Sequence, residues 1–223
     1  MSLFDKLFGR SESGRFKRLL KETRAEVDAT YGPLNRLGIA IVGAAFSAQR
    51  NLAQVFGFSM EGRPSEPQIL MFYEFLYFFS HVALRSVVAK GFTEPQIAKL
   101  QGCLGPLLAS TAVDSFFRHW PEDLKTKMNS EVYQKLNDAE VEYAGCRGLL
   151  SPDDPLSRDS LIGRVAGNVA DLWERPSDEL AKMAVASAAS EAFGAMQLDR
   201  LVGDVAVVID SVDSELIARF WKQ

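Results

Sequence analysis

The chain has 223 residues, of which 47% are hydrophobic, 24% charged and 10% aromatic, and its formal net charge is −4. These fractions are typical of a globular protein and exclude a disordered tail, a collagen-like chain and a disulfide-stapled miniprotein. The mildly acidic balance argues against a dedicated nucleic-acid binder, which normally carries a basic excess. We therefore expect a chain with a substantial hydrophobic core and no nucleic-acid partner.

The charge is distributed unevenly along the chain. Residues 1–24 hold seven basic and three acidic side chains, residues 25–120 hold seven of each, and residues 121–223 hold 11 basic and 19 acidic. The near-neutral total thus conceals a basic head, a neutral middle and an acidic back half. This segregation predicts that a charged partner would bind one region of the protein in preference to the others.

The N-terminal segment combines apolar and basic residues. We expect residues 1–12 to be a flexible or amphipathic segment, followed by an amphipathic helix over residues 14–31 with a basic polar face. This combination can lie on an anionic membrane surface, although a helix docked on the core after a frayed terminus is the favoured explanation. The residues that would contact a membrane or a partner are Leu3, Phe4, Leu7, Phe8, Lys17, Arg18 and Lys21.

Helical signals continue through the middle of the chain. A helix is expected over residues 33–56, and the next two helices, 66–90 and 94–120, both open with a capping-box pattern, Ser65-Glu-Pro-Gln68 and Thr93-Glu-Pro-Gln96. Gly91 marks the C-terminus of the first, and Gly105-Pro106 is expected to kink or split the second.

The helix over residues 66–90 is rich in aromatic side chains. Six aromatic residues occupy positions 72–79, so no side of this helix is left for water, and we expect it in the centre of the core. The same rings could instead form the wall of an apolar ligand site or a dimer interface. The phenylalanines assigned to such a wall are Phe72, Phe75, Phe78 and Phe79.

Three ionisable residues, Glu74, His81 and Arg85, fall on one stripe of this helix. They exclude a membrane span, because each charge costs a few kcal/mol at the bilayer centre. Burial of an unpaired charge is also unfavourable, so all three need partners. They form either a structural network between helices or a site that binds a polar ligand head or transfers protons.

The back half is predicted to be helical over residues 121–150, 156–174, 178–209 and 214–221. Two prolines and two acidic residues at 151–155 mark the clearest break in the chain. Gly163 and Gly167 predict close approach of a neighbouring helix. The fold class is therefore all-α: a single bundle of about eight helices, or two packed layers formed by residues 13–150 and 151–223.

No residue pattern indicates a metal or a cofactor. Cys103 and Cys146 are too few for a disulfide framework, and neither they nor His81 and His119 show ligand-like spacing. No secretory signal is evident, which predicts a cytoplasmic protein with free thiols. Diagnostic hydrolase, phosphate-binding and calcium motifs are also missing from the sequence.

Three functions remain open at this point. The first is a non-enzymatic interaction protein that self-associates as a homodimer, as the aromatic, charge-poor middle suggests. The second is a binding protein for an apolar or amphiphilic small molecule beside Glu74, His81 and Arg85. The third is a peripheral membrane protein that attaches through its N-terminus.

Overall fold

The computed structural model describes residues 31–61, 64–117 and 120–213. These residues form eight packed α-helices and contain no strand, which confirms the all-α fold class; an isolated bridge joins Gly148 to Ser160. Residues 31–51 form the first described helix. The others are α2 (Ala53–Phe56), α3 (Glu66–Ala89), α4 (Glu94–Phe117), α5 (Glu122–Ala144), α6 (Leu161–Leu172), α7 (Glu179–Ala195) and α8 (Leu198–Val208), followed by the 3-10 turn η1 (Ile209–Ser211).

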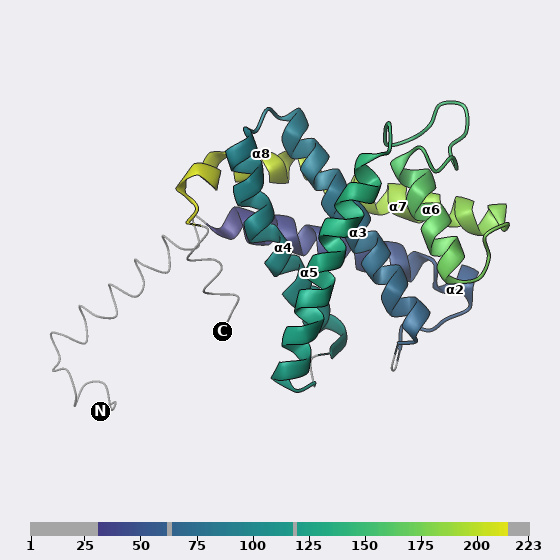
Figure 1. Cartoon of the computed structure of the whole chain (residues 1–223). Helices are drawn as coiled ribbons and strands as arrows, with labels where there is room; N and C mark the ends of the chain where they lie inside the picture. The colour runs from purple at the N-terminus through teal and green to yellow at the C-terminus, as the bar shows by residue number, and fades with distance from the viewer. Residues whose placement is uncertain (1–30, 62–63, 118–119, 214–223) are drawn as a thin grey trace, which may run out of the picture.

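Helix α3 is the centre of this arrangement. It contacts α4, α5, α6 and α8, and Figure 1 shows it running between α4 and α8 on one side and α6 and α7 on the other. Its aromatic rings pack on neighbouring helices; Phe72, for example, lies 4.4 Å from Phe46 of the first helix, centroid to centroid. The core is continuous and includes buried residues from both sides of the break at 151–155.

Local signals define the ends of α3 as the sequence predicts. The Ser65 backbone N–H donates to Gln68 Oε1 over 2.7 Å, which confirms the capping box. At the other end Gly91 adopts φ +82°, a left-handed conformation that favours glycine after a helix. The equivalent Gln96 contact forms at the start of α4, where Thr93 N–H donates over 2.9 Å.

Helix α4 is continuous through Pro106 and is not split. Gly105 allows close packing there, since a Cβ atom at that position would overlap the ring of Tyr133 from α5 unless that ring moved.

Three predicted helices of the back half have different ends. The predicted helix over 178–209 is wrong as a single element: the chain turns between α7 and α8, where Gln197 takes the left-handed φ of +50°. Helix α5 ends at Ala144 rather than near residue 150, and α6 begins at Leu161. The Ser160 hydroxyl defines the latter start by accepting from Gly163 N–H over 3.0 Å. The predicted helices over residues 14–31 and 214–221 lie outside the described residues.

The two glycines of α6 accommodate a loop, not a helix, which corrects the prediction. A Cβ atom on Gly163 would overlap the carbonyl of Ser157, and one on Gly167 would lie 2.6 Å from Arg158 Nε. The loop that links α5 to α6 therefore folds back onto α6 at van der Waals distance.

We predict that Gly163→Ala destabilises the protein by about 1–3 kcal/mol, because the added methyl group displaces this loop. Gly102→Ala is the matched control: its Cβ would meet no atom within 4 Å, and a helical alanine is favoured over glycine by about 0.5–1 kcal/mol. Urea denaturation measures both. Equal stability of the two variants would contradict the described loop packing.

Candidate functional site

The three ionisable residues of α3 do not converge on one pocket. His81 and Arg85 bond to α5 and the turn after it, whereas Glu74 bonds to Tyr143 of α5 and Asn168 of α6. The stripe therefore divides into two networks, which we describe in turn.

The first network joins the C-terminal half of α3 to the end of α5. Arg85 Nε donates to His81 Nε2 over 2.8 Å, and His81 Nδ1 lies 2.8 Å from Glu140 Oε2. The Arg85 guanidinium also donates to the carbonyls of Tyr143, at 3.2 Å, and Cys146, at 2.5 Å. Carbonyls at a helix C-terminus lack intrahelical donors and carry partial negative charge, so Arg85 satisfies them and fixes where α5 ends.

This geometry occupies both nitrogens of His81. Nε2 accepts from arginine, which cannot itself accept, so Nδ1 carries the proton that is donated to Glu140. His81 is buried, with 3% of its surface exposed. The ring has no free lone pair with which to accept a proton from a substrate in this arrangement. His81 and Arg85 are thus bonded to each other and to the end of α5, as the structural alternative predicts.

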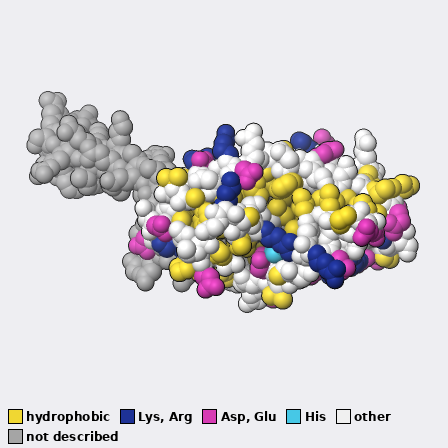
Figure 2. All heavy atoms as spheres, turned by 90° about the horizontal axis from the view of Figure 1, so that it is seen from above, with side chains coloured by type: hydrophobic (Ala, Val, Ile, Leu, Met, Phe, Trp, Pro, Cys, Tyr) yellow, Lys and Arg dark blue, Asp and Glu magenta, His cyan; other side chains and the backbone are white. Residues whose placement is uncertain are grey.

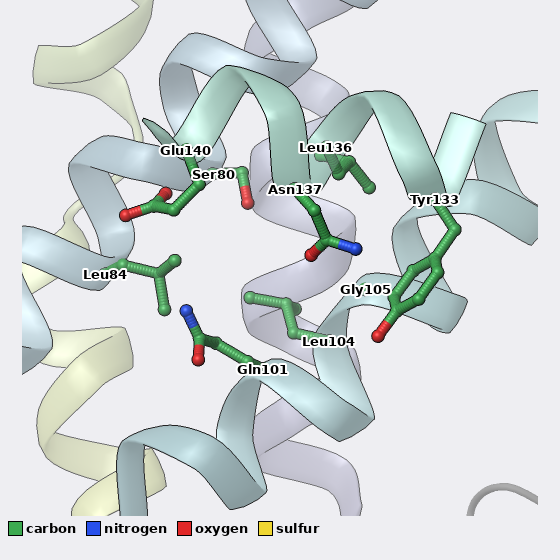
Figure 3. Close-up of a pocket in the computed structure, with 9 residues that line it drawn as sticks. All are labelled: Ser80, Leu84, Gln101, Leu104, Gly105, Tyr133, Leu136, Asn137 and Glu140. Carbon is green, nitrogen blue, oxygen red and sulfur yellow. The ribbon is translucent and has the colours of Figure 1, made fainter. Parts of the chain in front are cut away.

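A small cavity lies beside Glu140, between α3, α4 and α5 (Figure 3). Its volume is about 40 Å³, and its polar lining includes Ser80, Gln101 and Asn137. A space of this size with several polar partners suits a water molecule rather than an organic ligand.

The second network surrounds Glu74. Its Oε1 atom accepts from the Tyr143 hydroxyl over 2.5 Å and from the Asn168 amide over 2.8 Å. Burial raises the pKa of the Glu74 carboxyl, and these two hydrogen bonds oppose that effect. Tyr143 is fully buried, so its hydroxyl depends on Glu74 as an acceptor. The second oxygen, Oε2, has no hydrogen bond to any residue that the structure describes.

Glu74 also lines a larger pocket between α3 and α5, with a volume of about 290 Å³. Tyr73 and Tyr77 line the same pocket, with only 5% and 8% of their surfaces exposed. Both hydroxyls are buried and have no hydrogen-bond partner among the described residues. Burial raises the pKa of Tyr73 to about 12, so its hydroxyl remains protonated at neutral pH. Five buried side-chain atoms of the described residues lack a partner, on Gln49, Tyr73, Tyr77, Asn129 and Trp173, and two of these residues line this one pocket. Unpaired buried polar groups are rare in folded proteins, so this pairing needs an explanation.

The remaining predicted site residues lie elsewhere. The four phenylalanines have no exposed surface and line none of the pockets described above; they are Phe72, Phe75, Phe78 and Phe79. The predicted N-terminal contact residues, from Leu3 to Lys21, lie outside the described residues. Both cysteines are free and buried, and burial raises the pKa of the Cys103 thiol to about 11.

Five residues of the two networks and of the larger pocket were not predicted as site residues from the sequence: Tyr73, Tyr77, Glu140, Tyr143 and Asn168. A signal existed for the first two, because they are one helical turn apart and close to Glu74 in the sequence. They belong to the aromatic run predicted to form either the core or a ligand wall, but only its phenylalanines were assigned to the wall. The others come from α5 and α6, where nothing in the local pattern distinguishes them.

The comparisons with known proteins add no identification. No protein-family model matches the chain, and no curated protein and no solved structure is significantly similar to it. Within the described ranges, no helix combines the length and hydropathy needed to span a bilayer. The same residues contain no group of three or more His, Cys, Asp or Glu side chains that could hold a metal ion.

We predict that Glu74→Gln and Glu74→Leu have different effects on stability. Glutamine retains an acceptor for Tyr143, whereas leucine leaves that buried hydroxyl unpaired, which costs about 1–3 kcal/mol. Because the pKa of Glu74 is raised in the folded state, the folded protein binds this proton more tightly, and the contribution of Glu74 to wild-type stability declines as the pH rises above about 4.3. The stability of Glu74→Gln relative to wild type should therefore increase over that range and then level off above the folded-state pKa.

Urea denaturation of the three proteins between pH 4 and 8 makes the comparison. A constant difference between wild type and Glu74→Gln over this range would contradict the raised pKa.

Proposed function

We propose that this protein binds a small amphiphilic molecule in the pocket between α3 and α5, with the polar end of the ligand at Glu74. The observation that carries this proposal is the pair of buried, unpartnered hydroxyls of Tyr73 and Tyr77 in the pocket wall. A ligand with a polar head would supply the missing hydrogen bonds. An empty pocket leaves two buried polar groups unsatisfied, which is unfavourable.

The size and lining of the pocket suit such a molecule. Its volume of about 290 Å³ is close to the lower end of the range for small-molecule sites, about 300–1,000 Å³. Leu70, Ala139 and Leu172 provide apolar contact for a short hydrocarbon chain. A few converging polar groups on an otherwise apolar wall are typical of a binding site.

A second depression supports this choice by contrast. It lies at the junction of α7 and α8, has a volume of about 410 Å³, and includes Phe193, Gln197 and Leu198 in its lining. None of its lining residues has a buried polar atom without a partner in the part of the chain that the structure describes. The larger depression therefore has no polar group that requires a ligand.

Binding fits the pocket better than catalysis does. His81, the one described histidine, lies outside the pocket with both ring nitrogens engaged. The tyrosine hydroxyls remain protonated, and Glu74 is a lone, partly buried acid without a nucleophile beside it among the described residues. This set can orient a ligand, but it does not form an activated nucleophile with its base.

Self-association stays a prediction. Figure 2 shows hydrophobic side chains gathered across the middle of one face, with charged side chains around them. The most exposed large apolar residues belong to different helices: Ile39, Val141, Leu180 and Val207. This surface is compatible with an interface between two copies of the chain. Unlike the pocket, these four residues include no buried polar atom that lacks a hydrogen-bond partner.

The proposal is tested by NMR titration with three probes of equal chain length: octan-1-ol, octanoate and octylammonium. At least one probe should shift the Leu172 methyl and the Tyr73 and Tyr77 ring resonances in a saturable manner. Leu70→Trp, which fills the pocket, should abolish these shifts.

Val88→Trp is the matched control, because Val88 is 59% exposed on the same helix and does not line the pocket. It should leave the titration unchanged. Absence of saturable shifts with all three probes would overturn the proposed function.

A further inference from the structure

The pocket between α3 and α5 has an excess of negative charge. Three carboxylates, from Glu74, Asp138 and Glu142, line it together with a single basic side chain, Lys135. Glu142 is already engaged by Asn168 of α6, over 3.0 Å, and by a nearby arginine. Asp138 and Lys135, in contrast, form no ion pair with any residue that the structure describes. The pocket therefore favours a positively charged occupant.

The hydrogen-bonding capacity of Glu74 also favours a positively charged occupant. Glu74 Oε2 accepts no hydrogen bond from the residues that the structure describes, while Oε1 is held in place by two donors. A carboxylate in this position can accept only, so a neutral or anionic head without a donor gains nothing from it. An ammonium group supplies three donors and a charge, and hydrogen bonds between charged groups are about twice as strong as neutral ones.

The two tyrosines also suit a cation. Their rings are stacked with centroids 6.3 Å apart and planes inclined by 20°. Aromatic faces attract cations through the ring quadrupole, and a phenol oxygen has lone pairs that accept from N–H donors. The same side chains that remain unsatisfied in the protein alone can therefore contact an ammonium head.

Building on the proposed function, we propose that the ligand of this pocket is an organic cation, namely an alkyl or aryl ammonium whose charged head pairs with Glu74 and contacts Tyr73 and Tyr77. Its apolar part lies against Leu70 and Leu172. Lys135 is the intramolecular competitor, since this basic residue lines the same pocket.

Ligand binding is coupled to proton release. Burial raises the pKa of Glu74, and a bound cation favours the ionised carboxylate. Binding of an ammonium ligand should therefore release a proton wherever free Glu74 is still protonated. Affinity should increase with pH until free Glu74 is fully ionised.

Isothermal titration calorimetry with octylammonium, octan-1-ol and octanoate at neutral pH tests this inference. Octylammonium should bind about tenfold tighter than octanol, which corresponds to about 1.4 kcal/mol, and octanoate should bind most weakly. Glu74→Gln should weaken octylammonium about tenfold and leave octanol unchanged. Lys135→Met should strengthen octylammonium binding, because it removes the competing charge.

Glu122→Gln is the control for general electrostatic attraction: Glu122 is exposed on α5 and does not line the pocket. It should leave all three affinities unchanged. If octanol or octanoate binds as tightly as octylammonium, the cation inference fails while the proposed function stands. If Glu122→Gln weakens octylammonium as much as Glu74→Gln does, the site assignment fails. If no probe binds, both proposals fall.

Discussion

The burial of α3 on almost every side is the constraint from which the other features follow. A helix that contacts four others has little solvent-exposed surface on which to place charged groups, and yet this one carries Glu74, His81 and Arg85. Each of these groups needs a partner, because a buried unpaired charge costs several kcal/mol. The neighbouring elements supply the partners, and their positions determine which part of the stripe is structural and which part remains available to a ligand.

The structural part lies toward the C-terminus of α3. Arg85 connects His81 and Glu140 to the carbonyls that end α5, so one guanidinium satisfies both a buried imidazole and a helix terminus. Toward the N-terminus, Tyr143 and Asn168 occupy only one oxygen of Glu74, and Tyr73 and Tyr77 have no partner among the described residues. Helix α3 thus takes part in two networks. In the first, His81 and Arg85 are engaged in hydrogen bonds and hold the end of α5. In the second, around Glu74, hydrogen-bonding groups remain that a ligand could engage.

The sequence predicts features that depend on local signals and misses those that depend on contacts between distant segments. The bounds of α3 follow from a capping box and a terminal glycine, and the fold class follows from helical periodicity. The turn at Gln197 was missed because the apolar pattern continues through it without a proline, and the nearby Gly194 lies within α7, whereas the left-handed residue is Gln197. Glu140 and Tyr143 pair with α3 residues 59 and 69 positions away and lie on a polar helix without a distinctive motif. The stripe on α3 was predicted, but its division into two networks required those partners.

The central claim is that Glu74 is a partly buried carboxyl whose ionisation is favoured by a cationic ligand. An NMR titration of its side-chain carboxyl carbon, in the free protein and with saturating octylammonium, tests this claim most directly. The account predicts a pKa above the ordinary glutamate value in the free protein and a lower pKa in the complex. An ordinary pKa in the free protein, or a pKa that does not change when octylammonium binds, would contradict it.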